Sequence, residues 1–197
     1  NRFGAWCDFY FFFVKGRRPP GFPPFPTTAR FRTKALQAPI KQRYRDEPQS
    51  AVVTVRSTGT LDPPTLMCRV ETVGGQVAAG LHPAAGGDGS GACSADMLLD
   101  ALVACAGVTL NAVSTSLGID LRGGSITAEG EMDFRGTLGI NKEVPVGLSK
   151  VRLTFILDTD ADAAQVDKLI QLTERYCVIY QTLQHTPALS SDWSRLA

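Results

Sequence analysis

The apolar run SADMLLDALVACAGVTLNAVSTSLG, residues 94–118, constrains the fold more than any other stretch of this sequence. Its apolar residues recur every three or four positions, which predicts one long helix with a buried face. We expect Ser94 to cap the start, Asp96 to face the helix dipole, and Gly118 to end the helix. The predicted buried face comprises Leu98, Ala101, Leu102, Cys105, Val108, Thr109 and Ala112. Cys105 therefore lies in the middle of this face.

A second helix is predicted nearer the C-terminus by the same spacing. It starts between Asp160 and Ala163 and carries a single apolar stripe. The stripe comprises Val166, Leu169, Ile170, Thr173, Tyr176, Cys177 and Tyr180. Because Cys105 and Cys177 each lie on the apolar face of a helix, the two thiols can meet.

Four other runs are typical of strands. Residues 51–58 and 65–72 are rich in β-branched side chains and are separated by turn residues, so we expect a hairpin or two neighbouring strands. Residues 125–134 and 151–158 alternate apolar and polar side chains, as half-solvated strands do. Residues 74–92 offer a short strand and then a long glycine-rich loop. The glycines lack the GxxxxGK[ST] order of a phosphate-binding loop, so a plain flexible connection is expected. The element order predicts an α+β domain with helices packed on antiparallel sheet.

The N-terminal part of the chain differs from the rest in composition. Residues 1–47 hold ten of the 20 Lys and Arg residues but only three of the 19 Asp and Glu residues. We expect residues 1–33 to be a flexible, basic and Pro-rich segment, followed by a folded domain at 34–197. A short helix starting near residue 35 should end before Pro48.

This segment is not expected to bind nucleic acid or a membrane. Its arginines are scattered and interrupted by prolines, which disfavours a basic nucleic-acid arm. Its apolar run at 9–14 is much shorter than the roughly 20 residues that span a bilayer, and the positive charges follow the run instead of preceding it. A secretion signal is therefore not expected either.

The cysteines point away from metal chemistry. They are Cys7, Cys68, Cys93, Cys105 and Cys177. No two of them have the spacing of paired metal ligands, and the chain has only two histidines, so we expect no metal and no cofactor. An odd cysteine count without a secretion signal favours a reducing compartment, which predicts a cytoplasmic protein.

A single buried cysteine is by default a small hydrophobic residue. The pairing of Cys105 with Cys177 favours a chemical role instead. Small residues also surround Cys105 and would let another element or a small apolar ligand approach its sulfur; they are Ala101, Ala104, Ala106 and Gly107.

The stretch DMLLDALVACAGVTL, followed some seventy residues later by TERYCVIYQTL, resembles the OsmC/Ohr family of osmotically induced and organic hydroperoxide resistance proteins. The similarity covers roughly residues 35–190. It implies an OsmC-like α+β fold, with antiparallel sheets packed around two long buried helices in an intertwined homodimer whose active sites lie at the subunit interface. It also implies a cysteine-based peroxidase that reduces organic hydroperoxides and is reset by an external dithiol. By this match Cys105 would be the peroxidatic and Cys177 the resolving cysteine.

The sequence differs from the family pattern in the arginine that activates the thiol and in the residue after the second cysteine. Burial raises the pKa of a thiol, so a cation or hydrogen-bond donor must favour the thiolate. Family peroxidases use an arginine from an early strand and loop, and no matching motif stands out here; the candidates are Arg69, Arg135 and Arg175, each more typical of a surface residue. Val178 replaces the proline that often follows the second cysteine. Asp96 occupies the place of the acidic residue in the first turn of the family's helix, and we interpret it as a charge at the helix start in preference to a catalytic group.

Two hypotheses about function remain. One is a thiol peroxidase that reduces organic hydroperoxides, with hydrogen peroxide as a further substrate, through a Cys105 sulfenate resolved by Cys177. The other is a non-catalytic OsmC-like dimer that senses redox state or binds an apolar ligand. They differ in whether a guanidinium reaches the Cys105 sulfur.

Overall fold

The structure, a computed structural model, describes residues 29–195. Contacts divide the chain into two units, one up to Ser50 and one from Ala51 onward. In the first unit, helix α2 (Ala29–Asp46) ends before Pro48, where a 3₁₀ turn starts, so the expected helix and its end are confirmed. Its start at Ala29 lies before the expected start near residue 35. Residues 1–28 of the predicted flexible segment lie outside the described residues, and the domain boundary at residue 34 stays a prediction.

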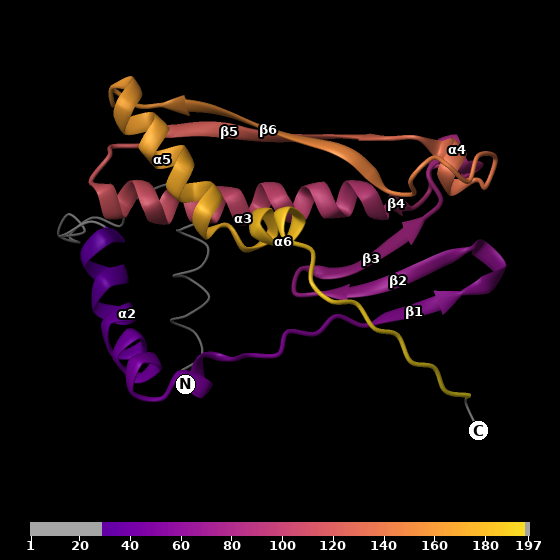
Figure 1. Ribbon diagram of the computed structural model, residues 1–197, viewed down its shortest axis with the longest axis horizontal. Helices are drawn as coiled ribbons and strands as arrows, with labels where there is room; N and C mark the ends of the chain where they lie inside the picture. Colours follow the sequence, from indigo (N-terminus) through magenta and orange to yellow (C-terminus); the bar gives the residue numbers. More distant parts are fainter. Residues whose placement is uncertain (1–28, 196–197) are drawn as a thin grey trace, which may run out of the picture. The chain divides into compact units, whose positions relative to one another are not determined.

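The second unit begins with a four-stranded sheet in the order β1-β2-β3-β4 (Figure 1). Its strands are β1 (Gly59–Asp62), β2 (Met67–Thr72), β3 (Gly75–Gly80) and β4 (Ala92–Cys93). β2 pairs antiparallel with both β1 and β3, whereas β4 joins β3 in parallel. β2 confirms the strand predicted over 65–72. β4 leads directly into the long central helix.

The strand predicted over 51–58 is wrong. Regular strand structure begins only at Gly59, and before it the carbonyl of Thr58 accepts a hydrogen bond from the N–H of Glu71 at 3.1 Å. Val53 and Val55 are 71% and 90% exposed. β-Branched residues favour a pleated surface that is at least half buried, and no described strand supplies such a surface here.

A second sheet consists of two long antiparallel strands, β5 (Gly123–Met132) and β6 (Leu148–Asp158). Their register is regular from Gly123 opposite Asp158 to Glu131 opposite Lys150, with one irregularity at Met132. The strands predicted over 125–134 and 151–158 are thereby confirmed. The connection between β5 and β6 holds one short helix, α4 (Phe134–Thr137).

Helix α3 (Ser94–Leu117) confirms the long helix of the central run and packs against β5 and two later helices (Figure 1). Gly118 ends it in the left-handed conformation at φ 76°, a conformation that suits glycine. Asp96 lies in the first turn as predicted. The N-cap is wrong by one residue, because Cys93 occupies that position and its side chain makes no capping hydrogen bond.

The buried face of α3 also differs from the prediction. The buried residues are Leu102, Ala106, Leu110, Val113 and Ser114, of which only Leu102 belongs to the predicted set. Val108 is 72% exposed. The helix carries small or apolar residues around most of its circumference, so the sequence pattern alone does not select one face.

The second predicted helix is in fact two helices. Helix α5 (Ala163–Tyr176) starts with a capping box between Asp162 and Gln165, and α6 (Val178–Gln184) follows it. Cys177 separates them in an extended conformation at φ −73° and ψ 110°. Its N–H still donates to Thr173 and its carbonyl accepts from Gln181. The chain therefore turns at Cys177 without leaving the backbone of that residue unpaired.

Two clusters of buried residues form the core of the second unit. One contains Leu102, Ala106 and Cys177, and the other contains Leu110, Val113 and Leu169. Both clusters are built from α3 together with the α5–α6 region, and side chains of β5 and β6 pack against both. These helices and strands position the cysteine pair.

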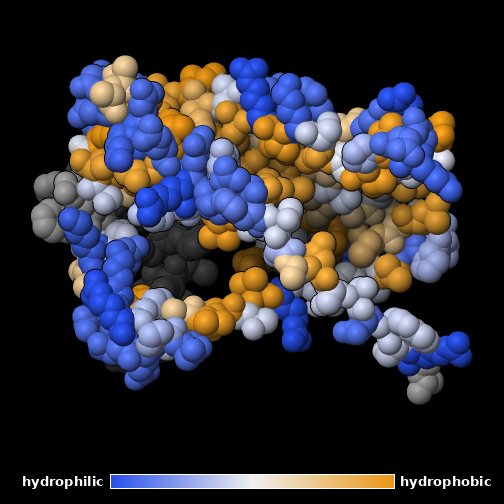
Figure 2. Space-filling view, in the orientation of Figure 1, coloured by the Kyte–Doolittle hydropathy of each residue, from blue (hydrophilic) through white to orange (hydrophobic). Residues whose placement is uncertain are grey.

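Apolar side chains also reach the surface, where Figure 2 shows them interspersed with polar ones. Among the described residues, α3 is the one helix long and apolar enough to cross a membrane by length and composition. The central helix of a globular domain meets the same criteria, and α3 contributes to both clusters of the core.

Candidate functional site: the Cys105–Cys177 pair

The structure brings the two predicted site residues together. Cys105 comes from the middle of α3 and packs against the core cluster that contains Cys177, at the junction of α5 and α6. Cys177 is 1% exposed and Cys105 is half-buried. Both cysteines are free thiols. A half-buried thiol lying against a fully buried one is an arrangement in which the first can meet a reagent and the second can react with the product.

Small side chains allow this approach. Ala106, the residue after Cys105, is completely buried between the helices. Ile179 and Tyr180, from the first turn of α6, pack against the same cluster. Because alanine projects only a methyl group, the start of α6 can come close to α3 at this level.

The surroundings of Cys105 favour its thiolate. Burial raises the pKa of this thiol, but hydrogen bonding from the backbone N–H of Ile179 and from the Cys177 thiol opposes that effect. The backbone N–H of Val178 and the hydroxyl of Thr109 lower the pKa further. The combined result is a pKa below the ordinary value of a cysteine.

The surroundings of Cys177 act in the opposite direction. Burial is the largest effect and raises the pKa of this thiol. Hydrogen bonding with Cys105 and the charge of Cys105 raise it further, while the backbone N–H groups of Tyr180 and Ile179 offset only part of the increase. Of the two thiols, Cys105 is therefore the one that loses its proton more readily.

The structure does not bring the three candidate arginines to this pair. Arg69 pairs with Asp62 at 3.2 Å. Arg135 forms an ion pair with Asp133, which lowers the pKa of that carboxyl group to about 2. The guanidinium of Arg175 lies over the ring of Tyr176, 5.7 Å from its centre. Each of the three is engaged with another side chain.

The groups that favour the Cys105 thiolate were missed by reasoning from the sequence. Backbone N–H groups are present at almost every position, so residue types do not reveal those of Val178 and Ile179 as donors. Finding them requires knowledge that the chain turns at Cys177. Thr109 had a detectable signal, because it follows Cys105 by four positions, the spacing of neighbours on a helix surface.

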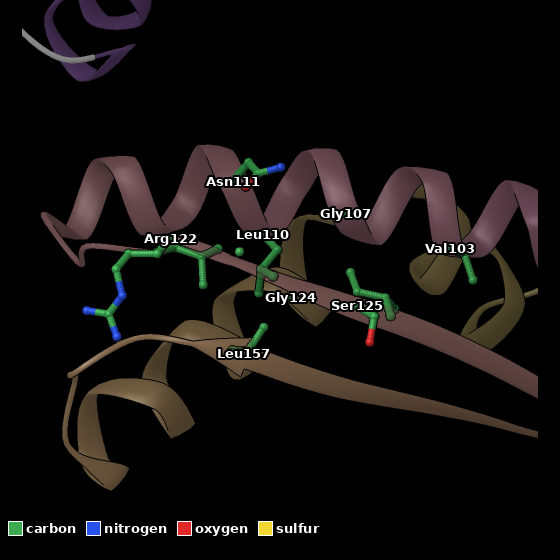
Figure 3. Close-up of a pocket in the computed structure, with 11 residues that line it drawn as sticks. Val103, Gly107, Leu110, Asn111, Arg122, Gly124, Ser125 and Leu157 are labelled. Carbon is green, nitrogen blue, oxygen red and sulfur yellow. The ribbon is translucent and has the colours of Figure 1, made fainter. Parts of the chain in front are cut away.

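Two cavities lie beside α3, away from the thiol pair. The larger, of about 380 Å³, lies between α3 and β5, with Arg122 near one end and Val103 near the other (Figure 3). Arg122 pairs there with Asp158 and Asp160. The other, of about 340 Å³, includes Asp96 among its lining residues. Neither cavity has Cys105 or Cys177 in its lining.

The described residues offer no clear place for a metal ion. Within 29–195, no group of three or more His, Cys, Asp and Glu side chains is arranged to hold one. The chemistry that the arrangement itself supports is that of two neighbouring thiols with unequal proton affinity.

Comparison with known proteins places this geometry in context. The sequence model of the OsmC-like protein family matches residues 87–192, a range that contains both cysteines. No curated protein matches the sequence.

Several solved structures share the fold. An OsmC-like protein from Mycoplasma pneumoniae has a TM-score of 0.58 at 16% identity, over 68% of this chain and 89% of that one. An organic hydroperoxide resistance protein from Elizabethkingia anophelis, crystallised with thiocyanate bound, has a TM-score of 0.56 at 17% identity, over 69% of this chain and 91% of that one. An organic hydroperoxide resistance protein from Legionella pneumophila has a TM-score of 0.54 at 17% identity, over 68% and 92%. At these identities the likeness is one of fold.

Proposed function

Because this chain belongs to the OsmC-like protein family, we propose that it is a cysteine-dependent peroxidase that reduces organic hydroperoxides. The observation that carries the proposal is the contact between two free thiols whose pKa values are displaced in opposite directions. Cys105 is the peroxidatic residue and Cys177 the resolving one.

In the first step, the Cys105 thiolate attacks the terminal oxygen of the hydroperoxide. A sulfur–oxygen bond forms, the O–O bond breaks, and the alkoxide leaves as the alcohol after it takes up a proton. The sulfur is oxidised to a sulfenic acid by two electrons, and the peroxide is reduced. Hydrogen peroxide is a further substrate for the same thiolate, with water as the leaving molecule.

In the second step, Cys177 attacks the sulfenic sulfur of Cys105. A disulfide forms, and the hydroxyl group leaves as water after it takes up a proton. An external dithiol then reduces the disulfide by thiol exchange and is itself oxidised. Each cycle converts one hydroperoxide and one dithiol into an alcohol, water and one oxidised dithiol.

The apolar setting of the pair supports an organic substrate. Ile126, Phe155 and Leu183 pack against the cluster that holds the cysteines, together with Tyr180. The Elizabethkingia anophelis and Legionella pneumophila proteins that share the fold are described as organic hydroperoxide resistance proteins. An alkyl or aryl hydroperoxide is compatible with both observations.

The working form is a homodimer in this proposal. The outward face of α3 leaves Val108 exposed, and Val53 and Val55 of the unpaired segment before β1 are also exposed. Exposed apolar surface is often covered by a partner in the working form of a protein. A second copy covers it, and the cytoplasm, which keeps thiols reduced, is the compartment that suits the cycle.

A second candidate function has a specific observation in its favour. The cavity of about 380 Å³ beside α3 has several apolar lining residues and is separate from the thiols. It fits the alternative of a non-catalytic dimer that binds an apolar ligand or senses redox state. Turnover separates the two functions, because a sensor or carrier reacts at most once per molecule.

Steady-state assays with several hydroperoxides and several dithiols test the proposal. The parent protein should turn over organic hydroperoxides, and Cys105→Ser should not. Cys68→Ser is the matched control, since Cys68 lies on β2 and should not affect turnover. Absence of turnover with every hydroperoxide and dithiol pair would favour the non-catalytic alternative.

A further inference from the structure

Gln181 bridges the break between α5 and α6. Its side-chain amide donates a hydrogen bond to the carbonyl of Glu174, in the last turn of α5, at 2.9 Å. Its backbone N–H donates to the carbonyl of Cys177 at 3.0 Å. Gln181 therefore binds the chain both at Cys177 and on the α5 side of Cys177.

The side-chain hydrogen bond takes the place of a backbone bond that the break removes. In a continuous helix, the carbonyl of Glu174 would accept from the N–H of Val178, four residues later. Cys177, at ψ 110°, lies outside the helical conformation, so the chain does not continue this pattern. The last carbonyls of a helix need partners from elsewhere, and Gln181 supplies one for Glu174.

The break sets the direction of α6 and thereby the packing around the thiols. Helix α6 runs in a different direction from α5 (Figure 1). In that direction Ile179, Tyr180 and Leu183 pack against the cluster that holds Cys177, and Cys105 packs against the same cluster. Glu174 and Gln181 are both half-buried, which limits competition from water for the hydrogen bond between them.

The sequence itself favours a competing structure. The apolar stripe from Val166 to Tyr180 fits one continuous helix, and no proline or glycine interrupts the chain between Ala163 and Gln184. A specific interaction is therefore needed to favour the broken form over the continuous one. The hydrogen bond between Gln181 and Glu174 is such an interaction, because it joins the two helices across the break.

Resting on the proposed function, we propose that Gln181 is a positioning residue for the resolving thiol: its hydrogen bond to Glu174 holds α6 at the break, and the break keeps Cys177 against Cys105. Gln181 acts through the backbone of the turn and takes no part in proton or electron transfer. Loss of the hydrogen bond should reduce the population in which Cys177 can attack the Cys105 sulfur, so a disulfide between the two should be less favoured.

The test measures how well Cys177 competes with glutathione for the sulfur of Cys105. In a fixed mixture of reduced and oxidised glutathione, the Cys105 thiolate attacks oxidised glutathione, which forms a mixed disulfide and releases one reduced glutathione. Cys177 then attacks the Cys105 sulfur, which forms the internal disulfide and releases the second. Peptide mass spectrometry gives the ratio of internal to mixed disulfide.

Gln181→Met should lower this ratio by roughly three- to tenfold, the effect expected for one hydrogen bond. Methionine has a similar length and helix propensity but no group that donates to the Glu174 carbonyl. Gln171→Met, which changes an exposed glutamine of α5, is the matched control and should leave the ratio unchanged.

A second background separates positioning from general stability. Val178→Pro imposes the break, because proline has no N–H to donate to Glu174 and disfavours a helical conformation at Cys177. In the Val178→Pro background, Gln181→Met should therefore have little effect on the ratio. A residue that only adds stability would have the same effect in both backgrounds.

An unchanged ratio in Gln181→Met would overturn the inference, as would an equal decrease in both backgrounds or a parent protein that forms no internal disulfide. If Gln181→Met does not fold, Gln181→Glu replaces it with the same expectations, because a carboxylate cannot donate to the carbonyl. Exchange with glutathione requires no hydroperoxide, so the test is independent of turnover. A lowered ratio in a protein whose parent form has no peroxidase activity would refute the proposed function and leave the role of Gln181 intact.

Discussion

Cys105 and Cys177 lie against each other, yet their surroundings displace the pKa values of the two thiols in opposite directions. Burial raises the pKa of both. At Cys105 the effect of burial on the pKa is outweighed by hydrogen-bond donors from α6, from Cys177 and from Thr109. At Cys177 the neighbouring sulfur of Cys105 raises the pKa further. A resolving thiol with a raised pKa competes less for the peroxide, so this difference separates the two roles.

The reactivity of the two thiols should accordingly separate as pH rises. An acid with a lowered pKa loses its proton at lower pH, so alkylation of Cys105 should increase at a pH where Cys177 still does not react. Peptide-resolved labelling with iodoacetamide across neutral and alkaline pH measures both sites in one sample. If Cys177 is labelled first, the assignment of the thiolate to Cys105 is wrong.

Replacement of each thiol should give a different failure. Cys105→Ser should reduce hydroperoxide turnover to the uncatalysed background, because no sulfur remains to accept the oxygen. Cys177→Ser should allow one oxidation and then accumulate sulfinic and sulfonic acid at Cys105, because nothing resolves the sulfenic acid. Intact-mass measurements during turnover distinguish the two. Equal loss of activity without over-oxidation in Cys177→Ser would argue against a resolving role.

At the scale of elements, the break between α5 and α6 creates the site. Val178 is the first residue of α6 and is 68% exposed, and its N–H contributes to the low pKa of Cys105. Proline is well suited to the first position of a helix, and the preceding Cys177, at φ −73° and ψ 110°, has a conformation that proline tolerates after it.

Val178→Pro should therefore fold normally and still slow the reaction of Cys105. We expect a melting temperature close to that of the parent protein and alkylation of Cys105 at neutral pH reduced by roughly three- to tenfold, because one hydrogen-bond donor is lost. Val178→Ala keeps the N–H and is the control. Unchanged alkylation in Val178→Pro would show that this N–H does not act on the sulfur.

The same elements show how far the sequence alone leads. Periodicity and end signals predicted the extent of α3, the two strands β5 and β6, and that Cys105 and Cys177 can meet. They did not identify the N-cap or the buried face of α3. They failed where tertiary packing decides. The stripe through Tyr176 and Tyr180 fits one continuous helix, and no residue type marks the break at Cys177. The β-branched residues 51–58 favour a strand, but a strand requires a partner that the described chain does not supply.

At the scale of the whole molecule, we expect a stable homodimer. The reason is the apolar surface that one copy leaves exposed on α3 and before β1, strengthened by family resemblance. Val108→Lys, on the exposed face of α3, should weaken association, because a charge would be buried without a partner. Analytical ultracentrifugation at micromolar concentration measures both proteins. A parent protein that sediments as a monomer would contradict this expectation.

The central claim is that Cys105 and Cys177 form a catalytic pair, and the most direct test is to identify the bond that forms on oxidation. The reduced protein is treated with one equivalent of cumene hydroperoxide, alkylated and analysed by peptide mass spectrometry. The account predicts a Cys105–Cys177 disulfide in the parent protein and none in Cys105→Ser or Cys177→Ser. The Cα atoms must then come within about 4.4–6.8 Å of each other, the range that a disulfide spans. If Cys105 stays reduced while Cys7, Cys68 or Cys93 is oxidised, the buried pair is structural and the peroxidase account is wrong.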